Sequence, residues 1–109
     1  MAVNENKVQL SVLKSLQKQG IFCWRQNNGA TYDPKLGGYR FNYSSIKGVP
    51  DIVGLLPNGK FLGVEVKSVK GKMSPEQFIF AKRIRESNGV YILARSAADV
   101  DNIVDNLLQ

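Results

Sequence analysis

Residues 48–67 read Gly-Val-Pro-Asp-Ile-Val-Gly-Leu-Leu-Pro-Asn-Gly-Lys-Phe-Leu-Gly-Val-Glu-Val-Lys, and the expected fold is built on this segment. Two runs rich in valine, isoleucine, leucine and phenylalanine, 49–56 and 60–68, lie on either side of Pro57-Asn58-Gly59. Proline, asparagine and glycine in succession are typical of a tight turn between two strands. The stretch therefore predicts a β-hairpin.

The length of the turn decides which side chains share a face of this hairpin. A two-residue turn at Asn58-Gly59 would pair Asp51 with Val66, whereas a three-residue loop would pair Asp51 with Glu65. The three-residue loop requires Gly59 in the left-handed conformation of a bulge, which glycine adopts without strain. In that register, which we take as the prediction, the two carboxylates lie directly opposite each other.

The rest of the chain extends outward from the hairpin as alternating helices and strands. Apolar residues at helical spacing precede Gly20, and Ser74-Pro75 followed by Gln77 has the pattern of a capped helix start. Ser96 and Asp99 likewise cap a final helix that runs through Leu107. The expected elements are helices over 4–19, 75–87 and 97–107, strands over 21–25, 49–56, 60–68 and 90–94, and a long loop or irregular ribbon over 26–45.

This order, α-β-β-β-α-β-α, predicts an α/β fold. A hairpin followed by a β-α-β crossover gives a mixed β-sheet flanked by helices. With 109 residues, the chain has the usual size of one domain, so we expect a single domain over 1–109.

Composition narrows the chemistry that such a domain can perform. The chain contains no histidine and one cysteine, which excludes Ser-His triads, imidazole bases and zinc clusters. Cys23 lies in an apolar run and is expected in the core. The net charge of +6 favours a polyanionic partner. Apolar runs are too short to span a membrane, so we expect no membrane partner and a cytoplasmic protein.

Glu65 and Lys67 lie two residues apart on a strand, so their side chains point to the same face. Taken alone, such a pair is ordinarily part of a solvated surface. With Asp51 opposite Glu65, two carboxylates repel each other and favour a compensating cation. Carboxylate oxygens suit Mg²⁺ or Mn²⁺. Lys67 could then counter the charge of a phosphate or position an attacking water.

Glu5 is a further acidic candidate in the first helix. It projects almost in line with Val8, Val12 and Leu16, so we expect it on the buried stripe. One explanation is that the helix dipole favours an acidic residue in the first turn. The other is that Glu5 is a ligand of the same metal.

These residues together resemble the PD-(D/E)XK nuclease superfamily and, within it, the VRR-NUC group. The resemblance rests on Gly48-Val49-Pro50-Asp51, Glu65-Val66-Lys67 and Ser74-Pro75-Glu76-Gln77 in this order of elements, and it covers nearly the whole chain. The chain lacks the Val-Arg-Arg sequence after which the group is named.

The resemblance implies a restriction-endonuclease-like core and specific roles for the motif residues. A metal would be held by Asp51, Glu65 and the Val66 carbonyl, and Glu5 matches the acidic residue of the family's first helix. Lys67 would be the catalytic lysine. Gln77 would reach into the site, although a helix-capping role explains this residue equally well.

Basic residues flank the proposed site on both sides in sequence. We expect them to contact phosphates in a salt-dependent way, the alternative being a merely solvated basic loop. The predicted nucleic-acid contacts are Arg25, Lys35, Arg40, Lys47, Lys70 and Lys72.

The resemblance implies a Mg²⁺-dependent DNA endonuclease, with Mn²⁺ able to substitute. It also implies action on branched DNA such as four-way (Holliday) junctions, by a homodimer in a bacterial or phage-infected cell. The alternative function is a basic DNA-binding module without catalysis, which would bind DNA regardless of Mg²⁺.

Overall fold

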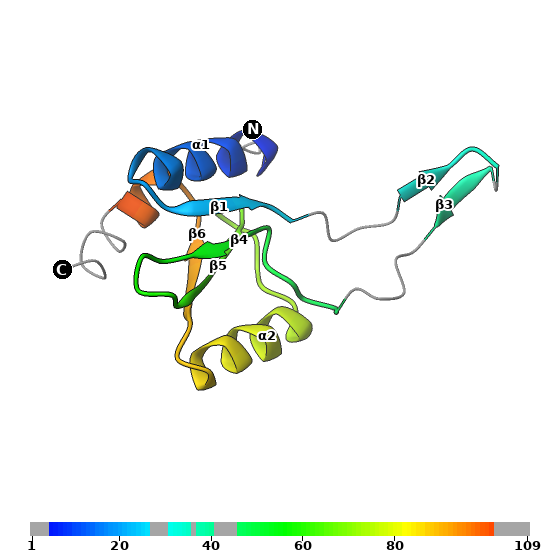
Figure 1. Cartoon of the computed structure of the whole chain (residues 1–109). Coiled ribbons are helices and arrows are strands. Elements are labelled where there is room, and N and C mark those ends of the chain that lie inside the picture. Colours follow the sequence, from blue (N-terminus) through cyan, green and yellow to red (C-terminus); the bar gives the residue numbers. More distant parts are fainter. Residues whose placement is uncertain (1–4, 27–30, 36, 41–45, 102–109) are drawn as a thin grey trace.

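The computed structural model describes residues 5–26, 31–35, 37–40 and 46–101 of the chain (Figure 1). Its elements follow the predicted order, with one additional pair of short strands inside the predicted long loop. They are α1 (Glu5–Lys18), β1 (Phe22–Arg25), β2 (Thr31–Asp33), β3 (Gly38–Arg40), β4 (Ile52–Leu55), β5 (Phe61–Val66), α2 (Pro75–Glu86) and β6 (Val90–Ala94).

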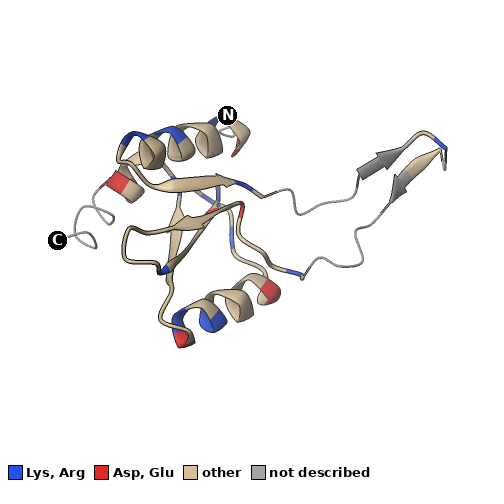
Figure 2. Ribbon diagram, in the orientation of Figure 1, with Lys and Arg blue, Asp and Glu red and all other residues tan. Residues whose placement is uncertain are grey.

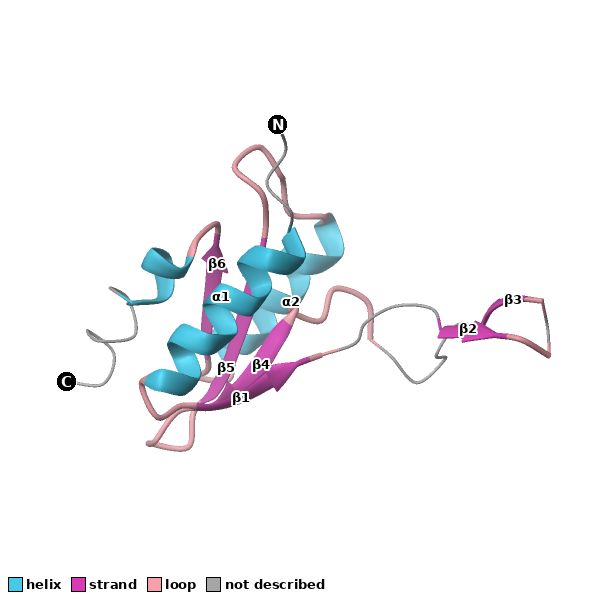
Figure 3. Ribbon diagram, turned by 90° about the horizontal axis from the view of Figure 1, so that it is seen from above, coloured by secondary structure: helices cyan, strands magenta, loops and turns pink. Residues whose placement is uncertain are grey.

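Four strands form one mixed sheet in the order β1-β4-β5-β6 (Figure 3). β1 pairs antiparallel with β4, β4 pairs antiparallel with β5, and β5 pairs parallel with β6. The parallel pair is joined through α2, as a crossover connection requires. The predicted α/β class and mixed sheet are therefore confirmed.

Helices cover both faces of this sheet, α1 on one side and α2 on the other (Figure 1). On the α1 side, Val12 and Leu16 are fully buried against a core that includes Leu62 and Val64 of β5. On the α2 side, Ala81 and Ile84 pack with Tyr91 of β6, together with the partly buried Met73 and Phe80. The face of β5 that carries Glu65 is thus covered by a helix, not solvated.

The β4–β5 register matches the three-residue loop. Ile52 lies opposite Val64, and Leu56 N donates to the carbonyl of Lys60 at 2.9 Å. Gly59 has a φ of +85°, the left-handed conformation that the bulge requires. One step beyond Ile52 and Val64, this register brings Asp51 opposite Glu65.

Both hairpin strands are shorter than predicted at the end that carries these acids. Asp51 lies at a bend before β4, and its carboxylate accepts the Val66 N–H at 2.9 Å. A side chain thus takes the amide that a continued strand would pair with backbone. The strand pairing ends where the acidic site begins.

α2 begins as the sequence predicts. The Ser74 hydroxyl accepts from Gln77 N at 3.2 Å, and the Gln77 side chain accepts from Ser74 N at 2.8 Å. The last predicted helix is described from residue 97 to 101, and Asp99 accepts from the amides of Arg95 and Ser96. Its expected continuation to Leu107 lies outside the described residues.

The predicted loop or ribbon over 26–45 contains the antiparallel pair β2–β3, which projects away from the body of the molecule (Figures 1 and 3). Gly37 turns the ribbon with a φ of +64°, and its N–H donates to the carbonyl of Pro34 at 3.3 Å. In the described part of the chain, no helix has the length and apolar character needed to cross a bilayer.

Candidate nuclease site

The site is built where the β4–β5 hairpin ends beside the start of α2. Asp51 is half-buried there, and Glu65 is only 2% exposed. The Lys67 Nζ lies 3.7 Å from Glu65 Oε1, and Gln77 Nε2 donates to the same oxygen at 3.1 Å. Three separate elements therefore bring Asp51, Glu65, Lys67 and Gln77 together.

The two carboxylates interact strongly. Burial, a side-chain hydrogen bond with Asp51 and the negative charge of Asp51 raise the pKa of Glu65 to about 8, and the charge of Lys67 opposes this rise. With no metal ion at the pair, this pKa means that Glu65 is mostly protonated at neutral pH despite the nearby Lys67 ammonium. A divalent cation at the pair would favour the ionised form instead.

Gln77 has both functions that the sequence left open. Its side-chain oxygen completes the helix cap at Ser74 N, and its side-chain nitrogen donates to Glu65. A single amide can do this because its oxygen only accepts and its nitrogen only donates. The cap thus fixes the direction in which the amide nitrogen points.

Glu5 lies near the site but not on the buried stripe. Val8, Val12 and Leu16 are buried whereas Glu5 is exposed, so the expectation that it shares their burial is wrong. The first turn of α1 extends past the edge of the core. Glu5 Oε1 accepts from Ser68 N at 3.3 Å, and its charge contributes to the raised pKa of Glu65.

The residues fit a hard divalent cation. Glu65 Oε2 is buried and accepts no hydrogen bond from the described residues, so the ionised carboxylate has one oxygen free to bind a cation; the hydrogen bond with Asp51 exists only while the pair holds a proton. Asp51 Oδ1 and the Val66 carbonyl are further oxygen donors of the kind that Mg²⁺ takes. Over those same residues, however, no three acidic, histidine or cysteine side chains come together as a cluster.

Two residues near the site were missed from the sequence. Tyr91 lies opposite Gly63 on β6, and its buried hydroxyl has no partner among the residues described. Burial and the charges of Glu65 and Asp51 raise its pKa. Arg95, which follows β6, contacts the loop after β5. A tyrosine in an apolar strand and an arginine after it gave no pattern from which to infer these contacts.

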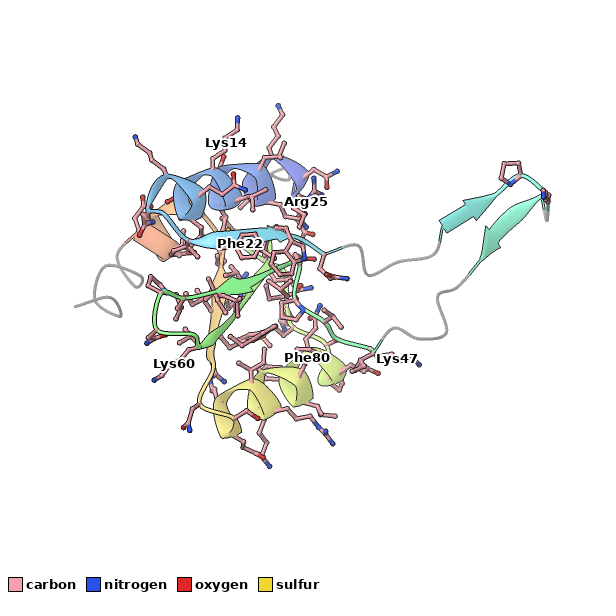
Figure 4. The ribbon with its side chains drawn as sticks, viewed as in Figure 1. Lys14, Phe22, Arg25, Lys47, Lys60 and Phe80 are labelled. Carbon is pink, nitrogen blue, oxygen red and sulfur yellow. The ribbon has the colours of Figure 1, made fainter. Side chains whose placement is uncertain are left out.

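The predicted basic contacts come from separate segments of the chain, and Figure 2 shows basic residues both on the body of the molecule and on the projecting ribbon. Arg25 ends β1 and donates to Asn6 Oδ1 at 3.3 Å, and Lys47 lies just before the Pro50-Asp51 bend. Both lie on the side of the body from which the ribbon projects (Figure 4). Lys35 is at the turn of the ribbon.

The remaining predicted basic residues lie in two other segments. Lys70 and Lys72 are exposed in the loop after β5. Arg40 belongs to β3, but its side chain lies outside the described part of the structure.

A mixed sheet between two helices, with an acidic pair and a lysine at the hairpin end, defines a PD-(D/E)XK-like nuclease domain. The family model of the VRR-NUC domain matches residues 3–98, so the chain belongs to the VRR-NUC family, a family of nuclease domains that generally use divalent metals.

A solved structure described as a VRR_NUC domain has the same fold. It is 23% identical, the alignment covers 93% of this chain and 94% of that chain, and the TM-score is 0.65. Among curated proteins, no sequence match was found.

Proposed function

We propose that this chain is a Mg²⁺-dependent DNA endonuclease, able to use Mn²⁺, that cleaves branched DNA such as four-way junctions. The observation that carries the proposal is Glu65, which is 2% exposed, faces Asp51 and Lys67, and has one oxygen, Oε2, that accepts no hydrogen bond from the residues that the structure describes. Burying such a pair costs free energy unless a cation compensates it. A purely structural role gives no reason for that cost.

Asp51, Glu65 and the Val66 carbonyl are the proposed metal donors, with Glu5 as an additional ligand from α1. When bound, Mg²⁺ supplies charge neutralisation at the phosphate and lowers the pKa of water near it. Glu5 is the most exposed of these donors, and in the present arrangement its carboxylate accepts a hydrogen bond from Ser68 N.

Lys67 is proposed to act on the reacting phosphodiester. Gln77 is proposed to act on the metal-binding carboxylate of Glu65. The Lys67 ammonium, next to Glu65, can stabilise the negative charge that grows on the phosphate oxygens as water attacks phosphorus. Gln77 holds the Glu65 carboxylate in place through its 3.1 Å hydrogen bond. Hydrolysis then breaks one phosphorus–oxygen bond and leaves a free hydroxyl and a terminal phosphate.

DNA would lie across the basic segments around the site. The proposed phosphate contacts come from β1, the ribbon, the segment before β4 and the loop after β5; they are Arg25, Lys35, Arg40, Lys47, Lys70 and Lys72. A net charge of +6 and the spread of these residues over several segments support backbone contact. Such contacts recognise the shape of a substrate and not its base sequence.

Three further parts of this proposal are supported by the family relationship. They are branched DNA as the substrate, a homodimer as the oligomeric state, and the cytoplasm of a bacterial or phage-infected cell as the location. The single domain over 1–109 is proposed on the same basis, since the family match spans 3–98. Sedimentation velocity of the purified chain would test the dimer, which predicts twice the chain mass of 12.1 kDa.

A DNA-binding module without catalysis is the second candidate. It is favoured by the absence, across 5–26, 31–35, 37–40 and 46–101, of a cluster of three metal-binding side chains. It is also favoured by Asp51 and Glu65 already accepting hydrogen bonds from Val66 N and Gln77. A binding module would retain DNA affinity in EDTA and would never cleave.

Incubation of the protein with a four-way junction, a linear duplex of equal length and supercoiled plasmid, each with Mg²⁺ or with EDTA, separates the two candidates. The proposal predicts cleavage with Mg²⁺ only and faster cleavage of the junction than of the duplex. Binding without cleavage in every Mg²⁺ sample would contradict it.

A further inference from the structure

The loop that follows β5 carries the site lysine at its base and two predicted phosphate contacts on its outside. Lys67 N still pairs with the carbonyl of Ala94, after which Gly71 N donates to Ser68 O at 3.0 Å and turns the chain. A Cβ at Gly71 would lie 3.3 Å from Lys67 Cβ, so the turn folds tightly back on the lysine. The shape of this loop therefore determines where the lysines beyond Lys67 lie.

Hydrophobic packing does little to hold this loop. Val69 is 73% exposed, and Lys70 and Lys72 are exposed. A loop with so little buried apolar surface opens at a small free-energy cost unless polar contacts fix it.

One arginine supplies such contacts. Arg95 Nη1 lies within hydrogen-bonding distance of three carbonyls of this loop, those of Ser68, Val69 (3.2 Å) and Gly71 (2.8 Å), and its two N–H groups are shared among them. A charged donor forms stronger hydrogen bonds than a neutral one, and here the acceptors all belong to one turn. With the carbonyls of the turn directed toward Arg95, the exposed lysine side chains remain available to a ligand.

Arg95 and the loop are each anchored to other parts of the fold. Arg95 N donates to Asp99 Oδ2 at 2.7 Å, which fixes the backbone from which the guanidinium extends. On the loop itself, Ser68 N donates to Glu5 of α1 while Ser68 O accepts from Arg95. The residue directly after Lys67 is thus held between a carboxylate and a guanidinium.

We infer that Arg95 is a positioning residue for the phosphate-binding loop, which it holds in the one conformation where Lys70 and Lys72 meet the DNA backbone beside Lys67. The inference rests on the proposed DNA-cleaving function. Arg95 acts through the loop, because its Nη1 is directed to the loop carbonyls.

The salt dependence of DNA binding tests this indirect action. The slope of log affinity against log salt measures phosphate contacts, at roughly 0.9 per contact on a duplex. The test compares four proteins in EDTA, which prevents cleavage: wild type, Arg95→Met, the double variant Lys70→Met with Lys72→Met, and the triple variant that combines all three substitutions. Arg83→Met, at an exposed arginine of α2, is the matched control for loss of one charge.

Arg95→Met is expected to weaken DNA binding about tenfold, as loss of a charge-assisted hydrogen bond would. It is also expected to reduce the slope of log affinity against log salt by the equivalent of up to about two phosphate contacts. In the background that lacks both lysines, it is expected to have no further effect. An additional loss in the triple variant would overturn the inference, since Arg95 would then contact phosphate itself. Wild-type binding by Arg95→Met would overturn it too.

Cleavage by endoproteinase Lys-C under native conditions measures loop order without any DNA. Arg95→Met is expected to be cut after Lys70 or Lys72 about tenfold faster than wild type or Arg83→Met, because an opened loop is what the protease cuts. Cutting rates are compared at equal distance below each melting temperature, which separates loop opening from global destabilisation.

An unchanged cutting rate would overturn the inference even if the protein cleaves DNA as proposed. Faster cutting of the loop, in a protein that neither binds nor cleaves DNA, would contradict the proposed function and leave Arg95 as the residue that orders the loop.

Discussion

The two ends of one face of the β4–β5 hairpin reverse the usual distribution of polar and apolar groups. At the turn end, Leu55 and Phe61 lie opposite each other and are 44% and 39% exposed. At the other end, Asp51 and Glu65 occupy the equivalent positions, and Glu65 is 2% exposed. The apolar pair is exposed to solvent, whereas Glu65 is covered and Asp51 is half-buried.

The acidic end of the hairpin carries a free-energy cost that the apolar end does not. Exposed apolar side chains on a surface are common, but a buried carboxylate without full hydrogen bonding is not. A hollow of about 640 Å³ opens beside Phe61, Ile79 and Phe80 at the apolar end, and Asp51 and Glu65 are not among its lining residues. The candidate chemistry lies at the end with Asp51 and Glu65, not in this hollow.

Removing one acid of the pair is expected to have the largest effect. Asp51→Asn keeps the shape and the acceptor for Val66 N but removes the charge that would hold a metal. Cleavage of a four-way junction should be abolished while DNA binding stays within a few fold. Asp101→Asn, at an exposed aspartate near Ser15, is the matched control and should cleave normally. An active Asp51→Asn enzyme would rule out the metal site.

Lys67→Met tests the cation next to the pair. If the ammonium stabilises charge in the transition state, kcat should fall by about 100-fold or more with little change in substrate affinity. Single-turnover cleavage alongside a binding titration at two salt concentrations measures both quantities. Turnover that survives at saturating DNA, with weaker and less salt-dependent binding, would make Lys67 a phosphate anchor only.

The buried pair also predicts how stability depends on pH. The pKa of Glu65 is about 8 in the folded chain against an ordinary value of 4.5, so the folded state binds the proton more tightly than the unfolded state. This contribution is fully present below pH 4.5 and is lost as pH rises through 8. It amounts to at most about 5 kcal/mol, from roughly 1.4 kcal/mol per pKa unit.

Glu65→Gln should flatten that dependence, because glutamine does not titrate. Urea unfolding at pH 6 and pH 8.5 in EDTA measures it, with Glu86→Gln, in an exposed ion pair with Lys82, as the control. Equal loss of stability in wild type and Glu65→Gln over this range would mean that Glu65 is not the titrating group.

Glu5 is expected to give the smallest of the activity effects. Glu5→Gln keeps a side-chain acceptor for Ser68 N but removes the carboxylate, so it should weaken Mg²⁺ activation several-fold if Glu5 is a ligand. Glu86→Gln should leave activation unchanged. Wild-type activation of Glu5→Gln, with a loss in Glu5→Ala, would make Glu5 an anchor of the loop instead.

The sequence predicted the hairpin end of the site because its geometry depends on local rules. The Pro57-Asn58-Gly59 loop sets the register, and the Ser74 cap sets where Gln77 points. The contacts of Arg95 and Tyr91 could not be predicted, since they depend on how β6 and α2 lie against the hairpin. The exposure of Glu5 was missed because helical spacing does not reveal where the core ends.

The most direct test of the central claim, that the buried pair holds a divalent cation, is the Mg²⁺-dependent rise in melting temperature at low salt. A ligand that binds only the folded state stabilises it by mass action. Wild type should gain stability with Mg²⁺, and more at pH 8.5 than at pH 6.5, because Mg²⁺ must displace the proton on Glu65. Glu65→Gln should gain little at either pH. An equal rise in both proteins, or none in wild type, would contradict the account.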